Sequence, residues 1–152
     1  NSRLRYQLIE NEEILLIAAR NTQLARSIPN GTPLHIAQAK EERFISLAVG
    51  HSIRTVQDRL FLLSGIQPEI LLESHNFEAC RRLTLALGAV MLCPDAYISR
   101  VPDLDLSEKL NAYPLLDGDM MRHFYLCCRR DMHLTRYMED FLTILRQCLA
   151  QS

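Results

Sequence analysis

The sequence predicts an α/β fold with a mostly parallel sheet. Between residues 44 and 94, apolar segments of strand length alternate with segments of helical periodicity. A polar residue stands at each strand-to-helix turn, and glycine or proline ends most segments. Alternation of this kind places helices on the faces of a parallel sheet. The predicted strands are 44–49, 70–73 and 89–93, and the predicted helices between them are 52–64 and 76–87.

The two central helices carry start and stop signals. Ser52 is predicted to cap the helix 52–64, and Gly65 is placed for the left-handed residue at its end. Asn76 is predicted to cap the helix 76–87, which Gly88 ends.

The flanking segments extend the same pattern. An apolar run at 13–19 is typical of a buried strand, whereas 20–40 contains two prolines around a glycine and is expected to be mostly loop. Further elements are expected in this order: a short helix at 95–100, a connector with helical character at 103–111, strands at 113–116 and 123–129, and an amphipathic helix that Thr135 caps and that runs to Leu149.

Composition excludes several classes. The chain has 152 residues, is 48% hydrophobic and 23% charged, and carries a formal net charge of −1, which is typical of a soluble globular unit. Without a basic run, direct binding to nucleic acid is not expected. The longest apolar stretch, 83–93, is too short to span a bilayer. Because the sequence begins with Asn and shows no signal peptide, it is expected to be part of a longer protein.

Cysteine and histidine patterns predict no metal centre and no cofactor. The five cysteines are odd in number, irregularly spaced and flanked by apolar residues, so reduced, buried cysteines in a cytoplasmic protein are expected. His35, His75, His123 and His133 have no spacing with carboxylates or cysteines that indicates a metal site.

The candidate binding site lies at the carboxyl ends of the strands. There the turn Gly50-His51-Ser52-Ile53 offers free helix N–H groups and a hydroxyl, which suit a carboxylate or another anion. Ser74, Asn76 and Phe77 follow the next strand and are expected at the same edge.

Each of these residues also has a purely structural interpretation. A role as helix cap alone stays open for Ser52 and Asn76, and a place in the core stays open for Phe77. Arg54 is placed to pair with Asp58 on a solvated helix face. Ser52 has no neighbouring base and no nucleophile motif around it, so no catalytic residue is predicted.

The motifs occur in the order found in a known family. In chain order these are 8–20 with 23–25, 44–45 with 50–54 and Asp58, 64–68 with 73–74, 87–94, and 129–131 with Leu134, Thr135 and Phe141. The set resembles the C-terminal part of the effector-binding (regulatory) domain of LysR-type bacterial transcriptional regulators. Val90 departs from the family pattern, which has a second glycine there, and Asn21-Thr22 stands in place of the usual His-Pro.

The resemblance implies a Rossmann-like lobe of the periplasmic-binding-protein kind plus part of a second lobe. On this basis residues 1–19 would end the first lobe, 20–115 would form the second, and 116–152 would return to the first. A small effector, here expected to be anionic, would bind between the lobes and modulate DNA binding by a winged helix-turn-helix that this sequence lacks. The residue that matches Ser52 often contacts effector in the family.

The family also implies a homodimer or homotetramer, no membrane and no enzymatic activity. The helix 52–64 has more apolar residues than one core-facing stripe needs, which indicates a partner surface. The interface residues predicted there are Val56, Arg59, Leu60, Phe61 and Leu62. Coverage of that face by the chain itself stays open as an alternative.

Two other functions stay open on the sequence. The chain could be part of a periplasmic-type solute-binding protein, although five cysteines and the lack of an export signal weigh against it. It could also be a small α/β enzyme, which would need a nucleophile–base pair at the strand ends.

Overall fold

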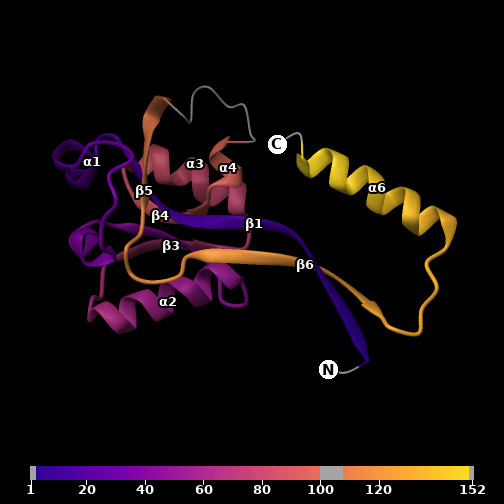
Figure 1. Ribbon diagram of the computed structural model, residues 1–152. Helices are drawn as coiled ribbons and strands as arrows, with labels where there is room; N and C mark the ends of the chain where they lie inside the picture. The colour runs from indigo at the N-terminus through magenta and orange to yellow at the C-terminus, as the bar shows by residue number, and fades with distance from the viewer. Residues whose placement is uncertain (1–2, 100–107, 151–152) are drawn as a thin grey trace. The chain divides into compact units, whose positions relative to one another are not determined.

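A computed structural model describes residues 3–99 and 108–150 (Figure 1). Contacts divide the chain into two compact units, Glu13–Met120 and Asn1–Glu12 with Met121–Ser152. Each unit is considered by itself. In the described part of the chain, every helix is too short or too polar to cross a membrane.

A six-stranded mixed sheet organises the chain. The order of its main path is β3-β2-β4-β1-β5, and β6 pairs with β1. β2 pairs in parallel with both β3 and β4, which confirms the predicted parallel centre. β1 runs antiparallel to β4 and to β5, so the parallel part is confined to three neighbouring strands. The strand bounds are β1 Leu4–Ala19, β2 Phe44–Leu47, β3 Ile70–Ser74, β4 Val90–Pro94, β5 Leu110–Pro114 and β6 Met121–Arg129.

Helices cover both faces of this sheet within the Glu13–Met120 unit. In Figure 1, α2 lies on one face, while α3 and the short α4 lie on the other. The segment 20–40, expected to be loop, also contains the short helices α1 and η1. The bounds are α1 Gln23–Ser27, η1 Ile36–Ala39, α2 Ser52–Ser64, α3 Phe77–Leu87 and α4 Ala96–Ser99. Most of the predicted connector 103–111 lies outside the described residues.

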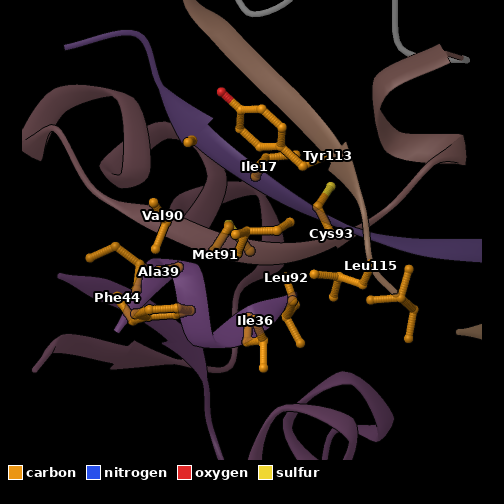
Figure 2. Close-up of a cluster of buried hydrophobic side chains, with 14 of the residues drawn as sticks. Ile17, Ile36, Ala39, Phe44, Val90, Met91, Leu92, Cys93, Tyr113 and Leu115 are labelled. Atoms are coloured by element: carbon orange, nitrogen blue, oxygen red, sulfur yellow. The ribbon is translucent and has the colours of Figure 1, made fainter. Parts of the chain in front are cut away.

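The core of this unit is apolar and centred on the inner strands. All residues of β2 and β4 are buried, because these strands have neighbours on both edges and helices on both faces. Figure 2 shows Phe44, Met91 and Leu92 packing beside Ile36 of η1. The Phe44 ring also meets Phe61 of α2 edge to face, with 5.0 Å between the ring centroids. This packing fixes α2 against the sheet.

The caps of the two central helices are as predicted, except at the start of α2. Gly65 and Gly88 both adopt left-handed backbone conformations at the helix ends, with φ of 63° and 61°. The side chain of Asn76 caps α3. The predicted cap Ser52 is wrong, because the N-cap of α2 is His51 and Ser52 is the first helical residue. Gly50, with φ of 103°, lies in the turn before this N-cap.

The second unit contains the first half of β1, together with β6 and α6 (Arg136–Ala150). Tyr6 and Tyr125 meet edge to face at 6.5 Å between ring centroids, and Arg122 pairs with Glu12 at 3.3 Å. Thr135 precedes α6 as predicted, and its hydroxyl accepts a bond from the Met138 amide at 3.4 Å. β1 is therefore much longer than the predicted strand 13–19, since its first half joins this unit.

Candidate functional site

The site is built on the register between β2 and β3. Leu47 lies opposite Ser74, and the Ala48 amide donates to the Ser74 carbonyl at 3.0 Å. The loops that follow the two strands therefore run side by side, and each opens a helix. His51 and His75, one from each loop, have ring centroids 5.7 Å apart. The predicted common edge is thus present, and we call the loops 48–52 and 74–76 the rim.

The amino end of α2 has no side-chain cap. His51, the N-cap, makes no side-chain capping bond, and its carbonyl accepts from the Thr55 amide at 3.1 Å. Among the described residues, the backbone amides of Ser52, Ile53 and Arg54 therefore have no hydrogen-bond acceptor. Such amides carry the partial positive charge of a helix N-terminus, and an anion satisfies them.

The amino end of α3 is capped by its own residues. Asn76 Oδ1 accepts from the Ala79 amide at 3.0 Å, and Ser74 Oγ accepts from the Asn76 amide at 3.1 Å. The structural interpretation of Asn76 as a cap is therefore confirmed. Its side-chain amide nitrogen and the exposed Ser52 hydroxyl add to the free amides of α2 as polar groups that these two helix starts offer a ligand.

The apolar residues of the predicted site serve mainly to build it. The Ile53 side chain is only 6% exposed and belongs to the core, so only its backbone amide is directed to the rim. Phe77 is partly buried, packs against the core and stacks on Tyr97 with 4.2 Å between ring centroids. Phe77 therefore packs the start of α3 against the core. This packing favours the interpretation that Phe77 fills the core.

Arg54 holds the base of the rim together. Its guanidinium donates to the Leu47 carbonyl at 3.1 Å, to Asp58 at 2.8 Å and to Glu73 at 2.6 Å. These contacts tie the end of β2 to α2 and to β3. The hydrogen bond that Arg54 donates to Asp58 raises the pKa of Arg54 above its ordinary value, with Glu73 acting in the same direction. The predicted pair with Asp58 is confirmed, and the contact with Glu73 is an addition that the sequence spacing did not show.

The predicted interface residues divide into two groups. Leu60 is 0% exposed and fixes α2 on the sheet, while Val56 and Phe61 are partly buried against the core. Arg59 and Leu62 are exposed, and Leu62 is 82% exposed. Its neighbour Leu63, 73% exposed, was not among the predicted residues although its place on the helix is similar.

The rim offers polar groups that suit ligand binding. In residues 3–99 and 108–150, no cluster of three or more His, Cys, Asp or Glu side chains could hold a metal ion. The thiol of Cys80 lies beneath the rim, where burial raises its pKa and its Sγ contacts the carbonyl of Ser46 at 3.5 Å. A thiol in that state is a poor nucleophile. The arrangement is therefore suited to holding an anion by amides and hydroxyls.

These features define an α/β ligand-binding lobe with its polar edge at the carboxyl ends of parallel strands. Residues 1–150 match the family described as the LysR substrate binding domain. The chain belongs to this family, whose members are effector-binding domains of transcriptional regulators and not enzymes. The solute-binding-protein and enzyme interpretations are accordingly disfavoured.

Solved structures show the same fold at low sequence identity. The regulatory domain of CcmR from Synechocystis PCC6803, in complex with 2-PG, is 19% identical with a TM-score of 0.76, and the match covers 96% of this chain and 67% of that one. The effector-binding domain of BenM with benzoate is 20% identical with a TM-score of 0.68, covering 99% and 65%. Full-length CbnR with its target DNA is 16% identical with a TM-score of 0.67, covering 98% and 50%. No curated protein matches the chain.

Proposed function

We propose that the chain senses a small anionic molecule for a LysR-type transcriptional regulator, in the cytoplasm, and that the anion binds at the rim of the Glu13–Met120 unit. The observation that carries the proposal is the uncapped start of α2, where three backbone amides have no acceptor among the described residues. Ser52 adds a hydroxyl, and His51 and Asn76 lie at the same edge. Relatives of this fold bind benzoate and 2-PG, which supports a small ligand.

The proposal extends to the arrangement of the chain. We assign the Glu13–Met120 unit to the second regulatory lobe, and the unit of 1–12 with 121–152 to the first. DNA binding would reside in a separate winged helix-turn-helix, as a DNA-bound relative of the same fold suggests. Effector occupancy would then act on DNA binding by shifting the population of regulator conformations.

Self-association through α2 completes the proposal. Leu62 and Leu63 are largely exposed at the end of α2, and Arg59 is exposed beside them. Exposed leucines on one helix lower the cost of pairing with a second copy of the chain. We therefore propose a homodimer or homotetramer in which this end of α2 is buried.

A charge reversal tests the anion site. Ser52→Glu places a carboxylate at the free amides, where it satisfies them and repels an anionic ligand, whereas Ser52→Ala removes only the hydroxyl. Thermal shift measurements with benzoate, shikimate and inorganic phosphate as probes should show stabilisation of the wild type by at least one of them. We expect a smaller shift for Ser52→Ala and none for Ser52→Glu.

The matched control is Gln67→Glu, which adds the same charge at an exposed position after α2. It should leave the ligand-induced shift unchanged. Stabilisation of the Ser52→Glu variant equal to that of the wild type would contradict the assignment of the anion to this helix start.

A further inference from the structure

Two imidazoles stand together at the rim although they are far apart in the sequence. The ring centroids of His51 and His75 are 5.7 Å apart, and the ring planes are inclined by 42°. His51 is half-buried and His75 is exposed. The pairing of Leu47 with Ser74 brings them together, because it sets the two loops in register.

Neither ring is engaged elsewhere in the described part of the chain. No hydrogen bond or ion pair joins the side chain of His51 or His75 to another described residue, and their contact is with each other. Other histidines differ, since His35 Nδ1 lies 3.5 Å from Asp117 and His123 Nδ1 lies 2.7 Å from Asn11. The rim pair therefore has its ring nitrogens available for a ligand.

The spacing fits two imidazoles on one metal ion. Metal–nitrogen bonds of about 2.0–2.1 Å place the centroids of two rings roughly 5–6 Å apart at tetrahedral or somewhat wider angles. The observed 5.7 Å lies in this range, so the ring positions are compatible with one shared ion. Imidazole nitrogen selects the later divalent metals of the first transition row, such as Ni²⁺, Cu²⁺ and Zn²⁺.

The charges around the pair permit a cation. Arg54 of α2 contacts both Asp58 and Glu73, so these three groups sum to one negative charge. That charge offsets the amino end of α2, which carries about half a positive charge. On α3, Glu78 pairs with Arg81 and Arg82, and these three groups sum to one positive charge, which cancels the negative charge of the group on α2.

We propose that His51 and His75 form a two-ligand site for a late first-row divalent cation. Two protein ligands leave further coordination positions to water or to a carboxylate, so the ion would remain exchangeable. The inference depends on the two imidazoles alone and holds whether or not the rim takes an effector.

Titration calorimetry with Ni²⁺ tests the site on the 152-residue chain. All variants should carry Cys127→Ser and Cys148→Ser, because these exposed thiols bind the same ions. We expect His51→Gln and His75→Gln each to weaken Ni²⁺ binding at least tenfold. His133→Gln is the matched control, because His133 is also exposed and has no side-chain partner among the described residues, and it should leave the affinity unchanged.

Electron paramagnetic resonance gives a second test, which does not depend on comparing the affinities of variants that could fold poorly. Cu²⁺ added to the protein with both rim histidines intact should show electron paramagnetic resonance coupling to two imidazole nitrogens, and His75→Gln should show one. The proposal would be overturned if the protein with Cys127→Ser and Cys148→Ser bound Ni²⁺ as tightly after His51→Gln and His75→Gln were both added. It would also be overturned if the protein with both rim histidines bound no Ni²⁺ at millimolar concentrations of the ion.

Discussion

The Gln57 side-chain nitrogen of α2 donates a hydrogen bond to the Ser46 hydroxyl of β2 at 2.6 Å, and both residues are buried. This bond lies beneath the rim and joins the helix that carries the proposed anion site to the strand before it. A buried polar pair of this kind is stabilising only while both partners are present, because a buried group without a partner retains its desolvation cost.

Gln57→Ala should therefore lower the free energy of unfolding by about 2–3 kcal/mol, which combines the lost hydrogen bond with a small cavity. Urea denaturation monitored by circular dichroism measures it. Gln67→Ala, on an exposed glutamine, should change stability by less than about 0.5 kcal/mol. Equal effects of the two substitutions would show that the buried bond contributes nothing.

A comparison of Gly65 with Gly88 distinguishes the effect of backbone strain from that of a steric clash. Gly65 and Gly88 have nearly the same left-handed backbone, but a Cβ at Gly65 would meet nothing within 4 Å, while one at Gly88 would lie 2.8 Å from Asn21 Nδ2. Gly65→Ala should lower the free energy of unfolding by about 1 kcal/mol, and Gly88→Ala should lower it by up to about 1 kcal/mol more. Introducing Asn21→Ala should remove this difference, as measured by urea denaturation. A difference that persists would mean that the contact with Asn21 is not its cause.

Local signals in the sequence predicted the elements whose cause is local. Asn76, Gly65 and Gly88 act through their own side chains or backbone freedom, so the limits of the central helices were readable. Ser52 failed as a cap because the turn at Gly50 makes His51 the N-cap and Ser52 the first helical residue, so turn geometry outweighed cap preference. The first half of β1 was missed because it is mostly exposed and is held by pairing with β6, a long-range contact without local periodicity.

The same distinction applies to the site. The strand-end rule placed Ser52 and Asn76 on one edge, because parallel strands share a direction. It did not predict that His75 meets His51 or that Glu73 meets Arg54, since both contacts depend on the register of β2 and β3. Spacing along the sequence carries no information on register when the strands are joined through a helix.

The acidic group of α3 should make stability depend on pH. Burial raises the pKa of Glu78, but hydrogen bonds and charge from Arg82 and Arg81 lower it, and the net pKa lies below its ordinary value. A lowered folded-state pKa means that the stabilisation is present above the unfolded-chain pKa of about 4.3 and is lost as the pH falls through the folded value.

Glu78→Gln should therefore reduce stability by about 1 kcal/mol at pH 7, a modest amount because the carboxylate is partly exposed. The difference between wild type and variant should shrink toward zero as the pH is lowered below about 4. Urea denaturation at pH 7, 5 and 3.5 follows this trend. A difference that grows on acidification would have the wrong sign and would reject the ion pairs as its origin.

The exposed end of α2 gives the sharpest test of self-association. Leu62 is 82% exposed and contributes little to the core, so Leu62→Glu should leave the unfolding free energy within about 0.5 kcal/mol of the wild type. In a dimer that buries this helix end, the same change puts a charge into an apolar contact and should weaken association at least tenfold.

Sedimentation velocity over a range of concentrations measures this association. Leu116→Glu is the control, because Leu116 is 54% exposed on another segment. Dissociation by the control alone would move the interface away from α2, and an unchanged assembly in both variants would exclude this helix end as the contact.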